Sequence, residues 1–212
     1  SLATLQFGKN VLAATNAYTL HLTDSSDLAG LPDFVKVMAA ETAKAKGLEG
    51  WAFTLDYPSY SPFLQYCSNR ELRKQIWMAY NTRAIGGEFD NTEIVKKIVD
   101  LRIKMANILG YETYADYALE ERMAKNKETV DAFIMQLLEP SMEFAKKDVA
   151  DVLAYAKKNG FEDDMLQSWD FTYWSERYKE AEYSLNTEAL KRYFQLESCI
   201  DAVFGLANTR YG

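Results

Sequence analysis

Apolar residues recur at intervals of three and four positions through most of the 212-residue chain, and this spacing constrains the fold more than any other feature of the sequence. The clearest stripe lies between residues 91 and 109, where such spacing is typical of one buried helix face. Asp90 or Asn91 can cap the start of this helix, Glu93 can complete a capping box with Asp90, and Gly110 can end it. The pattern predicts a mainly α-helical fold.

The same spacing predicts helices over most of the remaining chain. The expected helices cover residues 5–16, 32–46, 69–83, 114–123, 127–159, 169–183, 187–194 and 197–208. Pro140 lies inside the longest of them, and because proline lacks a backbone donor we expect a kink or a restart near residues 138–141. Residues 18–23 and 51–56 alternate in polarity and predict at most one short two-stranded ribbon. No repeat or linker divides the chain, so residues 1–212 are expected to form a single helical segment.

The charge balance argues against a nucleic-acid-binding protein. The chain carries 24 basic and 31 acidic side chains, a formal net charge of −7, and its basic residues occur in pairs such as Lys96-Lys97 instead of longer runs. Such a surface repels a phosphate backbone. An apolar content of 48% favours a folded chain. The sequence has no uninterrupted run of 18 apolar residues, so it predicts no membrane span.

Metal-ligating side chains are scarce. His21 is the only histidine, and the only thiols are Cys67 and Cys199. A zinc site needs several imidazoles or thiolates that converge, and these three positions have no ligand spacing. We therefore expect no metal-binding residue in this chain. His21 is interpreted as a partly buried imidazole bonded to a carbonyl, and the two cysteines as buried free thiols of a reducing compartment, with one disulfide as the alternative.

No other catalytic or cofactor-binding motif appears in the sequence. Acidic neighbours such as Glu120-Glu121 do not share a helix face, and no glycine-rich phosphate loop or nucleophile elbow occurs. Aromatic residues concentrate in 51–66 and 169–183, where we interpret them as core packing, with a peptide-binding wall as the alternative. The residues by themselves therefore predict a helical module with no catalytic and no cofactor-binding residue.

A series of short sequence motifs, called words below, nevertheless makes the chain resemble the dipeptidyl carboxypeptidases, or peptidyl-dipeptidases, of the thimet oligopeptidase family of zinc metallopeptidases. The words occur in the family's order and cover nearly the whole chain. They include Leu28-Ala29-Gly30-Leu31-Pro32, Ala43-Lys44-Ala45-Lys46-Gly47, Phe53-Thr54-Leu55, Arg70-Glu71-Leu72-Arg73, Tyr80-Asn81-Thr82-Arg83, Leu109-Gly110-Tyr111, Met123-Ala124-Lys125, Trp169-Asp170 and Tyr193-Phe194-Gln195-Leu196.

The resemblance implies a parent enzyme whose zinc is held by a His-Glu-x-x-His helix and a downstream Glu, with the motif Glu activating the attacking water. No residue of this chain matches that motif, which in the family follows the matched region. We therefore expect residues 1–212 to be the helical, inactive part of a larger peptidase, with zinc only in the full-length parent. The alternative is a self-contained helical binding or scaffold protein.

The resemblance also implies partners and a substrate for the parent. The resemblance implies a mostly helical, ellipsoidal enzyme that is split by a deep channel, and this channel admits short peptides. It also implies the reaction of the dipeptidyl carboxypeptidases, which release dipeptides from a free C-terminus. This segment would contribute scaffold and a channel wall, and its partner would be the remainder of the peptidase. Apolar helix faces such as that of 197–208 would then be exposed and could drive self-association. We expect a cytoplasmic location, with an exported parent as the alternative.

Overall fold

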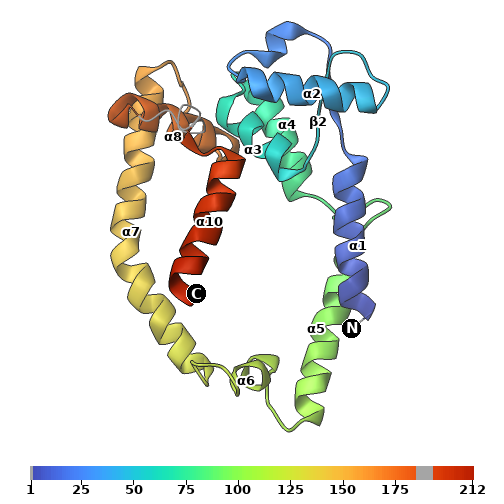
Figure 1. Ribbon diagram of the computed structural model, residues 1–212. Helices are drawn as coiled ribbons and strands as arrows, with labels where there is room; N and C mark the ends of the chain where they lie inside the picture. The colour runs from blue at the N-terminus through green and yellow to red at the C-terminus, as the bar shows by residue number, and fades with distance from the viewer. Residues whose placement is uncertain (1, 185–192) are drawn as a thin grey trace. The chain divides into compact units, whose positions relative to one another are not determined.

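The computed structural model describes residues 2–184 and 193–212, and it confirms that the chain is mainly α-helical (Figure 1). The chain divides into two compact units, residues 1–174 and residues 175–212, with the boundary inside a helix. The first unit contains the ribbon and the principal apolar core. The two units are described separately.

The first unit contains seven complete α-helices among its described residues, together with a small ribbon. Its strands are β1 (Leu20–Leu22) and β2 (Trp51–Phe53), and a 3-10 turn, η1, covers Ser25–Leu28. Its helices are α1 (Leu2–Ala17), α2 (Asp33–Ala45), α3 (Tyr57–Tyr66), α4 (Arg70–Asn81), α5 (Thr92–Ile108), α6 (Tyr114–Leu119), α7 (Lys127–Lys158) and the start of α8 (Ser168–Tyr183).

The ribbon confirms the predicted strand pair, although each strand has three residues instead of about six. Strands β1 and β2 are antiparallel, with His21 opposite Ala52. Leu20 and Leu22 are buried while His21 between them is exposed, because successive side chains on a strand point to opposite faces. Leu20, Leu22 and Phe53 therefore join the core, while on the opposite face His21 is exposed and its partner Ala52 is buried.

The core packs one face of this ribbon against α2, α3 and α4. Phe53 meets Phe63 edge to face, with ring centroids 4.6 Å apart, and Val35 and Ile76 are fully buried beside them. Burying each of these apolar side chains contributes about 1.5–3 kcal/mol to folding. The sequence pattern did not predict α3, which contains Pro58 and Pro62, because proline is normally read as a helix breaker.

Helix ends follow the expected residues with some corrections. Asn69 caps α4 by accepting hydrogen bonds from the backbone N–H groups of Glu71 and Leu72. At the start of α5, the Asp90 carboxylate accepts from the backbone N–H of Thr92 at 3.0 Å, but the expected capping box with Glu93 does not form. Glu93 instead pairs with Lys96 at 2.7 Å, one helical turn away.

Two of the expected helices, 114–123 and 127–159, differ from the structure in detail. Helix α7 is one continuous helix from Lys127 to Lys158 (Figure 1), so the restart near 138–141 does not occur, and the kink at Pro140 stays a prediction. The hydroxyl of Ser141 donates to the carbonyl oxygen of Leu137 at 2.6 Å in the turn around the proline. The expected helix 114–123 is shorter and ends at Leu119. Of the expected helix 187–194, residues 187–192 lie outside the described residues.

The second unit, residues 175–212, contains the end of α8 and helix α10 (Leu196–Tyr211). Gln195 precedes α10 without a side-chain cap, and Arg210 lies in its last turn, where a cation interacts favourably with the helix dipole. Val203, Phe204 and Leu206 are each more than 60% exposed within the described structure. The expected helix 197–208 is therefore confirmed, and so is the exposure of its apolar side chains.

Candidate functional site

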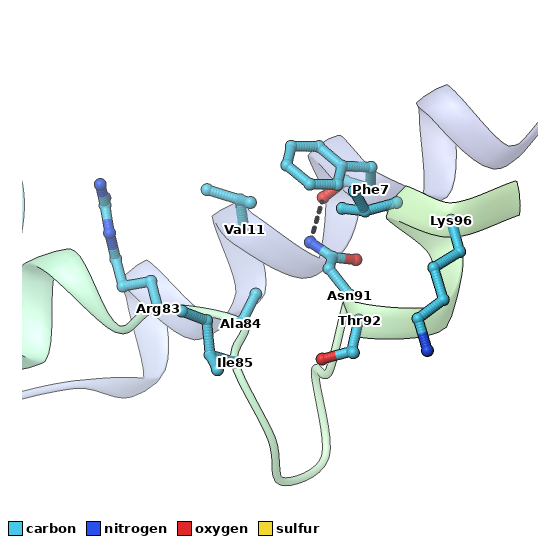
Figure 2. Close-up of a pocket in the computed structure, with 9 residues that line it drawn as sticks. Phe7, Val11, Arg83, Ala84, Ile85, Asn91, Thr92 and Lys96 are labelled. Atoms are coloured by element: carbon cyan, nitrogen blue, oxygen red, sulfur yellow. Dashed lines mark hydrogen bonds between the residues drawn. The ribbon is translucent and has the colours of Figure 1, made fainter. Parts of the chain in front are cut away.

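An apolar hollow of about 550 Å³ lies where α1 passes the start of α5 (Figure 2). Helix α1 contributes Phe7 and Val11, and the loop after α4 contributes Ala84 and Ile85. The start of α5 lines the hollow with Asn91, Thr92, Val95 and Lys96, and Arg83 lies at one end of the hollow. This lining suits an apolar side chain, and Lys96 at its edge is already paired with Glu93.

Asn91 holds the two sides of this hollow together. Its side chain is 4% exposed, and its Nδ2 donates to the backbone oxygen of Phe7 at 3.2 Å (Figure 2). Its Oδ1 accepts from Nδ2 of Asn10 at 3.0 Å, and its backbone N–H donates to the oxygen of Ala84 at 2.9 Å. One buried amide therefore fixes α1, the loop and α5 in a single arrangement.

Arg83 is engaged in holding the structure and not in binding at the hollow. Its Nε donates to the backbone oxygen of Tyr80 at 2.7 Å, and its Nη1 donates to Oγ1 of Thr15 at 3.0 Å. The guanidinium carbon lies 3.6 Å from the centre of the Tyr80 ring, which stacks in turn on Tyr60. Burial raises the pKa of Tyr60 to about 12.

A second cluster of polar side chains joins the start of α4 to the start of α8. Asp170 is fully buried and accepts two hydrogen bonds from Arg70. Nε of Arg70 donates to Oδ1 of Asp170 at 2.9 Å, and Nη2 donates to Oδ2 at 2.7 Å. Nη2 of Arg73, which is 2% exposed, donates to Oδ1 of Asp170 at 3.2 Å. Nη1 of Arg70 also pairs with Asp163 at 2.7 Å. The four charges compensate one another, as a buried ionic group requires.

Aromatic rings complete this cluster. Arg73 lies 4.0 Å from the centre of the Tyr173 ring, and Arg70 lies 5.0 Å from that of Phe161. The hydrogen bond to Asp170 raises the pKa of Arg70, whereas burial lowers the pKa of Arg73. Both guanidinium groups are committed to partners within the cluster, so the arrangement stabilises the fold and has no free group for chemistry on a ligand.

The residues weighed as metal ligands do not form a metal site in the described part of the chain. Nε2 of His21 lies 2.6 Å from the backbone oxygen of Glu49, which confirms the carbonyl partner, but the side chain is exposed instead of partly buried. Cys67 is buried and Cys199 is intermediate, and both are free. Within residues 2–184 and 193–212, no group of three His, Cys, Asp or Glu side chains could hold a metal ion.

The aromatic clusters are divided between core and surface. Phe53, Tyr60 and Phe63 lie in the core and Tyr173 is buried, in agreement with the packing interpretation. Tyr57, by contrast, is 72% exposed. The sequence did not single out the Arg70, Arg73 and Asp170 cluster as a site. Its only signal is the spacing of Arg70 and Arg73, which places two cations on one face of a helix.

Comparison with known proteins assigns the chain to a family. Residues 63–212 match the model of peptidase family M3. The chain is 40% identical to a protein named probable cytosolic oligopeptidase A of Arabidopsis thaliana over 98% of its own length and 30% of the relative. It is 38% identical to oligopeptidase A of Escherichia coli, again over 98% of this chain and 31% of the relative. It is 29% identical to dipeptidyl carboxypeptidase of the same bacterium, over 99% of this chain and 31% of that relative.

The chain therefore belongs to peptidase family M3, a family of metallopeptidases. The resemblance to the thimet oligopeptidase family is confirmed at that level. The narrower resemblance to dipeptidyl carboxypeptidases is not, because relatives named oligopeptidase A are more similar to the chain. The chain spans about 30% of the length of these relatives.

M3 peptidases use zinc, but the residues described here do not fit a zinc ion, because their donor set contains one exposed imidazole and no cluster of ligands. No chemical step is therefore assigned to a metal in this chain. In the part of the chain that the structure describes, no helix is both long enough and apolar enough to cross a membrane.

Proposed function

We propose that residues 1–212 are a non-catalytic helical segment of an M3 zinc oligopeptidase that cleaves short peptides. The observation that carries the proposal is the alignment of 98% of the chain with about 30% of each oligopeptidase A relative. The scarcity of metal ligands supports it, since hydrolysis by this family needs a metal centre that one histidine cannot build. The zinc and its ligands would then come from polypeptide outside residues 1–212.

The proposal is tested by comparing the chain with the complete M3 polypeptide to which it belongs. Both are purified, their zinc content is measured by mass spectrometry, and both are assayed with an internally quenched short peptide. The expected result is one zinc per complete polypeptide, cleavage that a chelator abolishes, and neither property in residues 1–212. Stoichiometric zinc or chelator-sensitive cleavage by residues 1–212 alone would contradict the proposal.

A complete polypeptide without peptidase activity would favour the other reading, a helical binding or scaffold protein. The genomic sequence around the segment separates the two at low cost. An encoded His-Glu-x-x-His after residue 212 supports the peptidase, whereas a coding region that ends near residue 212 supports the scaffold.

The cleavage mode is proposed to be that of an oligopeptidase, with dipeptide release as the second candidate. The higher identity to relatives named oligopeptidase A favours the first, and the 29% identity to dipeptidyl carboxypeptidase keeps the second testable. A peptide with a free C-terminal carboxylate and its C-terminal amide are digested in parallel. Equal cleavage of both supports the oligopeptidase, while cleavage of the free acid alone, with dipeptides as products, supports dipeptide release.

We propose a cytoplasmic location for the parent enzyme. One relative from Arabidopsis thaliana is named a probable cytosolic oligopeptidase A, although another is named an organellar, chloroplastic or mitochondrial form. Fractionation of the source cells followed by immunodetection of the complete polypeptide tests the proposal. Recovery in an organelle or an exported fraction would contradict it.

A further inference from the structure

Helix α7 carries a wide apolar face that the described structure leaves uncovered. All residues from Asp131 to Ala150 are exposed, whereas Val152 and Ala156 near the end of the helix are buried. The exposed large apolar side chains of the middle turns are Phe133, Ile134, Met135, Leu137, Leu138, Met142 and Phe144, each between 43% and 70% exposed. Only the last turns of this 32-residue helix are therefore packed.

The apolar side chains follow a continuous arc of the helix surface. At 3.6 residues per turn, the apolar side chains from residue 133 to residue 145 cover an arc of roughly 200°. The charged residues from 133 to 147, Glu139, Glu143, Lys146 and Lys147, all fall on the remaining arc, and the two aspartates that flank this stretch, Asp131 and Asp148, fall on the apolar side. The polar arc carries both acidic and basic side chains and suits a solvated surface. The opposite arc, formed by the exposed apolar side chains from Phe133 to Phe144, is here called the α7 apolar arc and does not suit such a surface.

The width of the α7 apolar arc indicates how many neighbouring elements are needed to bury it. A helix that lies on the surface of a globular protein buries a stripe of about 100° or slightly more. An arc of roughly 200° needs apolar neighbours on two adjacent sides, as in the interior of a larger helical array. A single neighbouring helix would leave part of the arc in water.

We propose that the α7 apolar arc is covered by the remainder of the same M3 polypeptide, an inference that rests on the proposed function. About 70% of the length of the relatives lies outside the region that this chain matches, and in a polypeptide of that length the cover would be covalently linked. A tethered partner acts at an effective concentration of the order of millimolar, well above that of a second copy at ordinary protein concentrations. The arc that carries Glu139 and Glu143 then remains in contact with water.

The test measures the accessibility of two positions in the complete polypeptide. Leu137→Cys lies in the α7 apolar arc, and Glu139→Cys, two residues away on the polar arc, is the matched control. Each is introduced into a background in which Cys199 and any reactive cysteine outside this chain are replaced by serine; Cys67 is fully buried. The rate of maleimide labelling is followed by mass spectrometry in the native protein and in urea.

The expected result is protection of the L137C thiol by at least about tenfold relative to urea in the native monomer, with the E139C thiol labelled at close to its unfolded rate. Equal labelling of both positions in the native monomer would overturn the proposal. Protection of L137C that disappears on dilution would also overturn it, because a second copy would then be the cover.

A measurement on the unsubstituted protein guards against a variant that fails to fold. Hydroxyl-radical footprinting of the complete wild-type polypeptide should leave Phe133 and Phe144 weakly modified in the native state and strongly modified in urea. Strong modification of both rings in the native state would overturn the proposal. Failure of the proposed function is a separate outcome. It would appear as a complete polypeptide without zinc-dependent cleavage, whereas the labelling and footprinting measurements report on the α7 apolar arc whether or not the polypeptide cleaves peptides.

Discussion

Arg70 and Asp170, a hundred positions apart in the sequence, form a two-point ion pair that joins the start of α4 to the start of α8. The carboxylate has no exposure to solvent, while the guanidinium is 36% exposed and also reaches Asp163. Paired hydrogen bonds of this geometry hold two elements in one orientation better than a single contact does. The first unit therefore depends on this pair to hold residues 161–174 beside α4.

Removing the buried carboxylate should destabilise the fold strongly. Asp170→Asn leaves Arg73 buried without a counter-charge, and breaking a buried pair in this way costs about 3–5 kcal/mol. Asp163→Asn is the matched control, since Asp163 is 54% exposed and such pairs contribute about 0–1 kcal/mol. Urea unfolding followed by circular dichroism measures both. Equal losses for the two variants would show that burial of Asp170 is not the decisive factor.

A second prediction concerns Gly30, where the backbone passes close to the end of α3. Its φ is +85°, and a Cβ there would overlap the backbone oxygen of Tyr66 and the hydroxyl of Ser68. Gly30→Ala should lower the free energy of unfolding by about 2–5 kcal/mol, from strain and overlap together. Gly47→Ala provides the control, since Gly47 has φ +69° but open space around it, and should cost only about 1 kcal/mol. The same unfolding assay decides between the two.

Asn91 should prove more important than its position in a loop suggests. Asn91→Ala leaves the oxygen of Phe7 and the amide of Asn10 without their partner and should cost about 1–3 kcal/mol. Hydrogen exchange should then accelerate in α1, because the amide is what fixes that helix to the start of α5. Asn10→Ala, which removes one of these bonds and spares the other, should give a smaller acceleration. Unchanged exchange in α1 with Asn91→Ala would refute this role.

Much of the fold follows from local patterns in the sequence. The stripe between residues 91 and 109 predicted α5, and Gly110, with φ +89°, ends it as expected. The missed helix α3 shows the limit of such rules, because its burial of Tyr60, Phe63 and Leu64 outweighs the cost of Pro62. Tertiary packing offsets Pro62, whereas Pro58 in the first turn is a local helix-start signal that the apolar spacing did not include.

The candidate site was harder to predict than the fold. The bond between Asn91 and Phe7 joins positions 84 residues apart, and the pair between Arg70 and Asp170 joins positions 100 apart. Composition and helical spacing contain no information on which distant polar groups will be buried together. The exposure of His21 was missed for a related reason: a carbonyl partner was expected, and Glu49 provides it, but the sequence did not show that the His21 side chain lies in solvent.

The Asp90 carboxylate should make stability depend on pH in the acid range. It accepts hydrogen bonds from Oγ1 of Thr92 at 2.6 Å and from the backbone N–H of Gly86 at 2.9 Å, which lower its pKa below the ordinary 3.8. A group whose pKa is lowered in the folded state stabilises above its unfolded pKa, and this contribution is lost as the pH falls through the folded value. Asp90→Asn should therefore be less stable than wild type at pH 6, and the difference should narrow as the pH falls below 3.8. A difference in urea midpoint that stays constant with pH would argue against this linkage.

Self-association of residues 1–212 in isolation is expected from α10. Val203, Phe204 and Leu206 are 66%, 69% and 62% exposed, and apolar side chains grouped on one helix in this way favour association between copies. Phe204→Glu places a charge among them and should shift sedimentation toward the monomer, while Asn208→Glu, near the end of the same helix, changes the net charge equally and should not. The complete M3 polypeptide should remain monomeric if its other parts cover this face. A concentration-independent monomer for unsubstituted residues 1–212 would show that exposure of α10 alone does not drive association.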